Sequence, residues 1–294
     1  MFYTLFMKTF DLVADIERII SILDLSVESF ANEVGVSRVT IINIINGYES
    51  YSKDIIEKIY SYAYENKVDL NRGKELIYTD IAEKRVLLFH GAKGELVGNV
   101  DINHSIPPND FGNAFYTGQS LKQAASWISN KDNGSVYAFF LSDYKDLKIM
   151  RFAANSDWLY AVLYYRNAFK DFKPTNKIMN LIKRIEESDL IIAPIADNEM
   201  FKTIDAFANG EITDEACIHA ISATNLGIQY VFKSNLACSK LKLIERMYLC
   251  KKEKEHFLTE KDNLSREGIN KSKLSLVEYR RKGKYFDEIF KRNG

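Results

Sequence analysis

Three short segments of the sequence place chemically active side chains at the ends of apolar runs. The first carries a histidine and a glycine, the second a carboxylate, a glycine and two aromatic rings, and the third an amide. They are residues 87–92 (LLFHGA), 110–117 (DFGNAFYT) and 228–232 (IQYVF). Together these groups suit a ligand with a flat ring and sugar hydroxyls, because aromatic rings stack and hydroxyls form hydrogen bonds.

Cleavage of NAD would use each of these groups. The glycosidic bond of NAD breaks through an oxocarbenium-like state, as in glycoside hydrolysis. The backbone of Gly91 can approach the nicotinamide carboxamide because no side chain blocks it. A ring at Phe115 or Tyr116 can stack on nicotinamide, and His90 and Gln229 can each bind a ribose hydroxyl. The structural alternative is that a histidine at a strand end and a Phe-Tyr pair are core residues.

The order of the motifs resembles the ADP-ribosyltransferase superfamily, in its histidine–tyrosine–glutamate branch. The resemblance is carried by His90-Gly91 and by Phe111-Gly112-x-x-Phe115-Tyr116. It implies that NAD is the substrate and that no metal takes part. It assigns catalytic roles to His90, Tyr116 and Gln229. It also implies an NAD-binding set, which is His90, Gly91, Asp110, Phe111, Gly112, Phe115 and Tyr116.

More closely, the chain resembles a bacterial family often found beside toxin–antitoxin genes. The resemblance spans roughly residues 85–244 and rests on four ordered blocks. These are residues 110–117, 189–197 (DLIIAPIAD), 209–213 (NGEIT) and 229–233 (QYVFK). It implies a toxin-like mono-ADP-ribosyltransferase whose acceptor is a protein, DNA or RNA, with a cognate antitoxin as a further partner.

One residue departs from the branch, because Gln229 stands where a glutamate is usual. A glutamine can orient a ribose hydroxyl, but it cannot carry negative charge or act as a base. Asp110 or Asp197 can supply the missing carboxylate, and Gln229→Glu is expected to preserve or raise NAD cleavage. Two alternatives stay open. One is a DNA-binding regulator with a degenerate NAD-sensing module, and the other is an NAD glycohydrolase with water as acceptor.

The elements that would position these residues indicate an α+β fold. Expected strands are 85–89, 114–117, 136–141, 190–196 and 229–232, and expected helices are 120–129, 157–168, 176–187, 199–208, 213–222 and a basic C-terminal one. No Gly-rich phosphate loop follows a first strand, which disfavours a Rossmann or P-loop site. The resemblance implies an ADP-ribosyltransferase-like split β-sheet with flanking helices over residues 80–294, including a basic helical C-terminal extension.

The preceding residues, 1–75, predict an all-α domain. Residues 25–47 have the pattern of helix, tight turn and helix, with Val39, Ile42 and Ile45 expected on the inner face. This pattern resembles the Cro/repressor type of helix-turn-helix domain. The resemblance implies DNA contacts from Ser37, Arg38, Thr40 and Asn43. The alternative is a helical bundle that contacts protein, and a linker is expected at residues 71–79 because Asn71, Arg72 and Gly73 interrupt the helical pattern.

Bulk composition sets the remaining limits. The 294 residues suffice for two domains, and 40 Lys and Arg balance 40 Asp and Glu, so global charge gives no argument for nucleic acid. The cysteines, Cys217, Cys238 and Cys250, lack metal-ligand spacing and are expected to be reduced. We expect no signal peptide and no membrane span, and therefore a cytoplasmic location.

Overall fold

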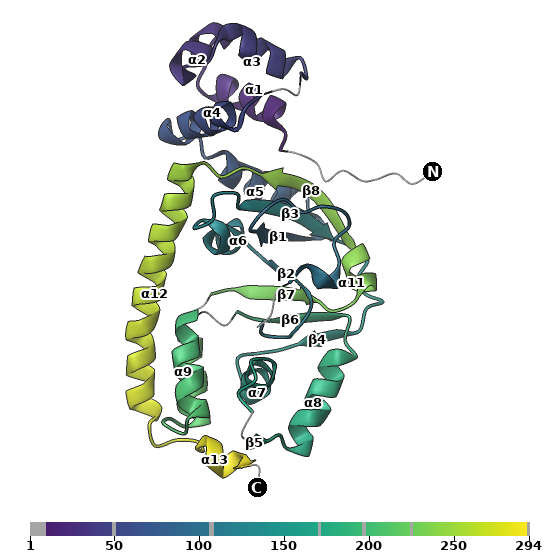
Figure 1. Ribbon diagram of the computed structural model, residues 1–294, viewed down its shortest axis with the longest axis vertical. Coiled ribbons are helices and arrows are strands. Elements are labelled where there is room, and N and C mark those ends of the chain that lie inside the picture. The colour runs from purple at the N-terminus through teal and green to yellow at the C-terminus, as the bar shows by residue number, and fades with distance from the viewer. Residues whose placement is uncertain are drawn as a thin grey trace. The chain divides into compact units, whose positions relative to one another are not determined.

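The computed structural model describes residues 10–48, 51–105, 109–169, 172–195, 198–223 and 226–292. The chain divides into two compact units (Figure 1). The first unit comprises Met1–Gly98, Ser120–Phe140 and Lys242–Thr259, and the second comprises Asn99–Gln119, Leu141–Leu241 and Glu260–Gly294.

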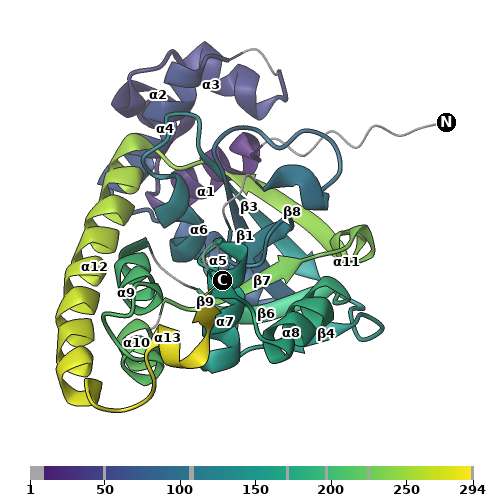
Figure 2. The same ribbon diagram turned by 60° about the horizontal axis from the view of Figure 1, so that its bottom comes forward.

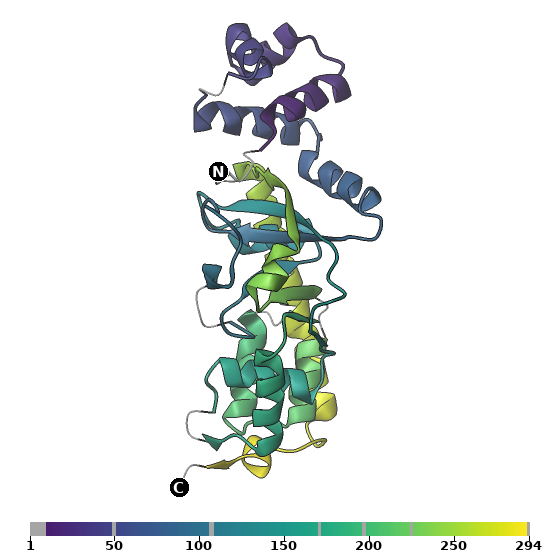
Figure 3. The ribbon, with the colours of Figure 1, turned by 90° about the vertical axis from the view of Figure 1, so that its right-hand side faces the viewer.

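Five helices open the first unit, and the purple-to-blue ribbon in Figure 3 follows them. They are α1 (Leu12–Ile22), α2 (Val27–Val34), α3 (Arg38–Ile45), α4 (Lys53–Glu65) and α5 (Leu70–Asp80). Each begins after an Asp or Ser whose side chain accepts a hydrogen bond from a backbone N–H of the first turn. The predicted helix pair is thereby confirmed as α2 and α3, with Ser26 and Ser37 as their caps.

The predicted inner face of α3 is wrong. Ile41 and Ile44 are buried, whereas the Val39 side chain is 66% exposed. Ile42 and Ile45 are only half-buried. A run of four isoleucines broken by one asparagine fits two helical faces almost equally, and packing against α1 and α2 selects the face with Ile41.

The predicted linker at residues 71–79 is also wrong, because those residues lie inside α5. Asp69 accepts a hydrogen bond from Arg72 N and starts the helix, so Gly73 is accommodated within it. The Lys74 side chain is fully buried. The first unit therefore continues from the N-terminal helices, through α5, into the strands that follow.

Three strands of the first unit lie in the order β1 (Val86–Ala92), β3 (Ser135–Leu141) and β8 (Leu241–Met247). Helix α6 (Leu121–Ile128) packs against β1, and its Leu121, Ala125 and Ile128 are buried with Phe89 of β1. A capping box of Ser120 and Gln123 starts this helix. The 29-residue α12 (Lys251–Tyr279) begins in this unit and continues into the second.

The second unit is built on a mixed sheet in the order β4-β6-β7-β2. The strands are β4 (Ile149–Arg151), β6 (Leu190–Pro194), β7 (Ile228–Phe232) and β2 (Phe115–Gly118). β4 and β6 run parallel, and β7 runs antiparallel to both β6 and β2. A smaller antiparallel pair joins β5 (Phe172–Lys173) to β9 (Lys291–Arg292).

Helices cover one face of this sheet and bury a large apolar core there (Figures 1 and 2). They are α7 (Ser156–Tyr165), α8 (Asn176–Glu186), α9 (Asn198–Ala208), α10 (Asp214–Ser222) and α13 (Phe286–Ile289). The second unit also contains the short helices η1 (Ile102–His104) and α11 (Asn235–Ser239). Ile191 of β6 and Val231 of β7 contribute to the core from the sheet. The expected α+β class is confirmed. Among the described residues, no helix combines the length and apolar character that crossing a membrane requires.

Candidate functional site

The turn before β2 has a fixed shape. The Gly112 φ of +74° lies in the left-handed region, and an added Cβ would come 3.0 Å from the Tyr165 ring, so glycine is required here. The Tyr116 hydroxyl closes the turn, because it donates to Gly112 O at 2.7 Å and accepts from Phe111 N at 3.2 Å. Burial, and next the negative charge of Asp110, raise the pKa of Tyr116 well above its usual value. Tyr116 is therefore a neutral hydrogen-bonding group, not a base.

Gln229 of β7 joins this turn to β6. Its Nε2 donates to Asp110 Oδ2 at 3.0 Å and to Pro194 O at 3.0 Å. Both partners only accept hydrogen bonds, so they fix the orientation of the amide. Each amide hydrogen is thus used, and the oxygen Oε1 is the atom that Gln229 can offer to a ligand.

Arg166 completes the group, although sequence reasoning missed it. It caps the C-terminus of α7, and its Nε and NH2 atoms donate to Asp110 Oδ1 at 3.1 and 2.6 Å. A charge-assisted pair of this kind fixes the orientation of the carboxylate. The available signal was a lone arginine directly after a strongly apolar helix. The carboxylate of Asp110 is thus held between a cation and the amide of Gln229.

Lys233 supports the same turn from the end of β7. Its nearly buried side chain donates to Phe111 O at 2.9 Å, and its Nζ lies 3.2 Å from Glu186 Oε1. The Tyr165 hydroxyl donates to the same carboxylate oxygen. Residues 110–112 are consequently held by Arg166 at the end of α7, by Gln229 on β7 and by Lys233 directly after β7.

Of the two candidate stacking rings, only Tyr116 lies on the face of the sheet that Gln229 shares. Tyr116 pairs with Val231, whose side chain enters the core beneath the helices. Phe115 points to the opposite face because side chains alternate along a strand. It is 1% exposed, and its ring centroid lies 6.4 Å from that of Phe232. Packing in the protein interior is therefore sufficient to explain the aromatic ring at Phe115.

His90 and Gly91 belong to the first unit. An added Cβ at Gly91 would lie 2.5 Å from Ala124 O, so the approach of α6 to β1 alone requires glycine there. Phe89 packs on α6 as well, and the alternation along β1 therefore points His90 away from α6, where it is half-buried. Thus the structure brings together Asp110, Phe111, Gly112, Tyr116 and Gln229, and it places His90 and Gly91 in the other unit.

Two further predicted groups have separate surroundings. On α3, Arg38 and Asn43 are exposed, while Ser37 and Thr40 share a hydroxyl–hydroxyl hydrogen bond of 2.7 Å at the helix start. Asp197 lies outside the described residues. All three cysteines are free and buried. Among the described residues, no cluster of three or more His, Cys, Asp or Glu side chains suits a metal ion.

Comparison with known proteins shows the family to which the chain belongs. Residues 86–243 match the family described as protein of unknown function (DUF3990), which is more than half of the chain. The chain belongs to the DUF3990 family. The DUF3990 stretch contains all of the turn, Arg166, Gln229 and Lys233, together with His90 and Gly91. No curated protein and no solved structure matches the chain.

Proposed function

We propose that this protein cleaves NAD and transfers ADP-ribose to a macromolecular acceptor, as a mono-ADP-ribosyltransferase. The observation that carries the proposal is the hydrogen bond of 3.0 Å from Gln229 Nε2 to Asp110 Oδ2. It joins the third motif of the sequence to the second through a buried carboxylate. This arrangement places a carboxylate, itself in an ion pair with Arg166, beside the glutamine.

The proposed role of Gln229 follows from the hydrogen bonds that its amide already makes. Because both hydrogens of the Gln229 amide are used, Oε1 accepts a hydrogen bond from a ribose hydroxyl of NAD. As the glycosidic C–N bond breaks, nicotinamide leaves with the bonding electrons and positive charge develops on the ribose. The dipole of the Gln229 amide, whose oxygen is directed at the ribose in this proposal, favours that charge. A nucleophile of the acceptor then bonds to the ribose carbon and releases its proton to water.

Arg166 and Lys233 act as positioning residues in this proposal. Arg166 holds Asp110, and Lys233 holds the carbonyl of Phe111. Neither has to touch NAD, because each fixes the turn that the Tyr116 hydroxyl closes. Pre-organised groups of this kind stabilise a transition state without rearranging during the reaction.

The proposal is tested by incubating the full-length protein with NAD labelled on the adenylate part, in lysate. We expect label in macromolecules, and digestion with protease or nuclease identifies the acceptor. Asp110→Asn should lower labelling at least tenfold, whereas the exposed-pair control Asp146→Asn should not change it. Nicotinamide release without macromolecular label would indicate a glycohydrolase. No release and no label from wild type would contradict the proposal.

A further inference from the structure

A strongly basic turn follows α12. Residues 280–284 contain Arg280, Arg281, Lys282 and Lys284, and all four residues are exposed. Within the described part of the chain, none of these four cations forms an ion pair. The Lys282 Nζ lies 4.3 Å from the centre of the Tyr279 ring. Four positive charges are therefore gathered on one short surface segment.

The backbone of this turn is firmly anchored to the start of α10. Asp214 N donates to Lys284 O at 2.9 Å, and Lys284 N donates to Asp214 Oδ1 at 2.8 Å. The Thr213 hydroxyl donates to Lys282 O. The Tyr279 ring stacks on His219 with centroids 3.6 Å apart and an interplanar angle of 14°. The turn is thus held in one shape, and its cationic side chains are the groups left for a ligand.

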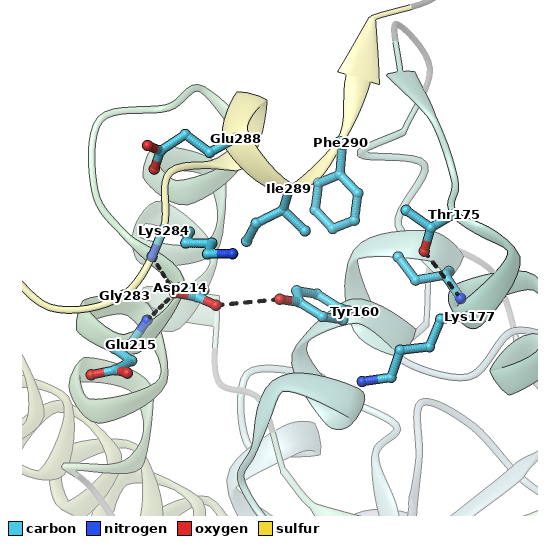
Figure 4. Close-up of a pocket in the computed structure, with 11 residues that line it drawn as sticks. Tyr160, Thr175, Lys177, Asp214, Glu215, Gly283, Lys284, Glu288, Ile289 and Phe290 are labelled. Carbon is cyan, nitrogen blue, oxygen red and sulfur yellow. Dashed lines mark hydrogen bonds between the residues drawn. The ribbon is translucent and has the colours of Figure 1, made fainter.

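A cavity of about 490 Å³ adjoins the turn (Figure 4). Its lining combines rings and aliphatic groups with two amines: Tyr160, Ile178, Ile289 and Phe290 with Lys177 and Lys284. In Figure 4 the carboxylates of Glu215 and Glu288 point away from the Tyr160 ring. The third carboxylate, Asp214, accepts hydrogen bonds from the backbone N–H groups of Glu215 and Lys284 and from the Tyr160 hydroxyl. A recess that offers the rings of Tyr160 and Phe290 beside cations suits a base attached to a phosphate backbone.

We propose that the turn of residues 280–284 and this cavity bind single-stranded nucleic acid. Phosphates contact the four cations, with the guanidinium groups able to make paired hydrogen bonds, and a base enters the cavity. Tyr285, which is 40% exposed, follows the turn directly and offers a further ring for stacking. The assignment does not rest on NAD chemistry, so its test is separate from that of the proposed function.

The distribution of charge along the chain favours the basic turn, rather than the N-terminal helices, as the nucleic-acid site. Residues 10–66 contain ten Asp and Glu but only four Lys and Arg, whereas residues 271–284 contain six Lys and Arg and one Glu. Phosphate contacts dominate nucleic-acid affinity and need local positive charge. The N-terminal helices are therefore a poor electrostatic match for nucleic acid, and the basic turn is a good one.

The test is fluorescence anisotropy of the full-length protein with labelled oligouridylate and oligothymidylate of about twelve nucleotides. We expect binding that weakens as salt rises. The triple variant Arg280→Ala, Arg281→Ala, Lys282→Ala should weaken binding at least tenfold and reduce the salt slope by about 2, at roughly 0.7 per lost contact. The two probes distinguish RNA from DNA as the preferred strand.

The control is a second triple variant, Lys84→Ala, Lys93→Ala, Lys145→Ala, which removes three exposed charges elsewhere. It should bind like wild type. Thermal unfolding of each variant checks that the fold is kept. Absence of binding by wild type at low salt would overturn the proposal, as would tighter binding of a DNA duplex. Equal losses in both triple variants would overturn it too, and so would a loss in Arg38→Ala with none in the turn variant.

Discussion

At the scale of single residues, the account depends on which atoms of Gln229 are free. Its amide nitrogen is 3.0 Å from both Asp110 Oδ2 and Pro194 O, and the side chain is buried. A carboxylate at this position would face two acceptors with no hydrogen to share. This geometry reverses what the sequence led us to expect for a glutamate here.

We therefore predict that Gln229→Glu lowers the free energy of unfolding by about 1–3 kcal/mol and does not raise NAD cleavage. Urea unfolding measures the first effect, and nicotinamide release measures the second. Gln119→Glu is a matched control, because Gln119 donates to the Tyr230 hydroxyl at 3.3 Å and that hydroxyl can donate in return. A Gln229→Glu protein as stable as wild type would contradict the assigned amide orientation.

The sequence identified most of this residue set, but not its connections. Types and order pointed to Asp110, Tyr116 and Gln229, and Asp110 was already a candidate for the missing carboxylate. Arg166 was missed because its partner is 56 residues away, and no local pattern reports such a contact. Gly91 shows the converse, since packing against Ala124 O accounts for a glycine that the sequence explains equally well by ligand approach.

At the scale of elements, helix α5 carries a buried ion-pair network that the sequence did not predict. Lys74 Nζ lies 2.6 Å from Asp15 Oδ2 on α1 and 2.6 Å from Glu245 Oε1 on β8. The hydroxyls of Tyr60 and Tyr78 donate to the same two carboxylates. Within the first unit, α5 thus links the N-terminal helices to the strands, where a flexible linker was expected.

We predict that Lys74→Met destabilises the protein by about 3–5 kcal/mol, because two buried carboxylates would lose their shared cation. A fragment that starts at Tyr78 should fail to unfold cooperatively for the same reason. Thermal and urea unfolding test both, with Lys58→Met as a control that removes an exposed pair with Asp54. Cooperative unfolding of the fragment at the wild-type midpoint would show that the strands do not need this link.

Helices were easier to predict than strands for a physical reason. Capping side chains such as Ser26, Ser37 and Thr213 lie next to the helices that they start, so the signal is local. Strand β8 was missed because the charged residues Glu245 and Arg246 interrupt its alternation of apolar and polar side chains. The structure pairs both, Glu245 with Lys74 at 2.6 Å and Arg246 with Glu95 at 3.1 Å. Charges that are neutralised by distant partners cannot be separated from surface charges in a sequence.

At the scale of the whole molecule, a neutral total hides unequal local charge. The balance of 40 positive and 40 negative residues gave no argument for nucleic acid. The acidic N-terminal helices and the basic turn after α12 lie at opposite ends of the sequence and cancel in that sum. Only the placement of residues 280–284 on an anchored turn makes the local excess informative.

The stability of the whole protein should depend on pH through Glu253. This carboxyl is 5% exposed, and burial raises its pKa from 4.5 to about 8, although Asn71 Nδ2 donates to both oxygens. The folded state therefore binds this proton more tightly than the unfolded state. The stabilisation is complete below about pH 4.5 and is lost as pH rises through about 8.

We predict that the unfolding free energy of wild type, relative to Glu253→Gln, falls by about 1.4 kcal/mol per pH unit between those limits. Urea unfolding at a series of pH values measures this difference. Glu255→Gln alters an exposed neighbour on the same helix and should follow the wild-type curve. A difference that does not change with pH would mean that Glu253 titrates normally.

Nicotinamide release by purified full-length protein tests the central claim most directly. The account predicts that wild type releases nicotinamide from NAD, and that Gln229→Ala lowers kcat at least tenfold with little change in KM. The reason is that the contact to Oε1 strengthens only as positive charge develops on the ribose. No release by folded wild-type protein, or unchanged turnover in Gln229→Ala, would contradict the claim.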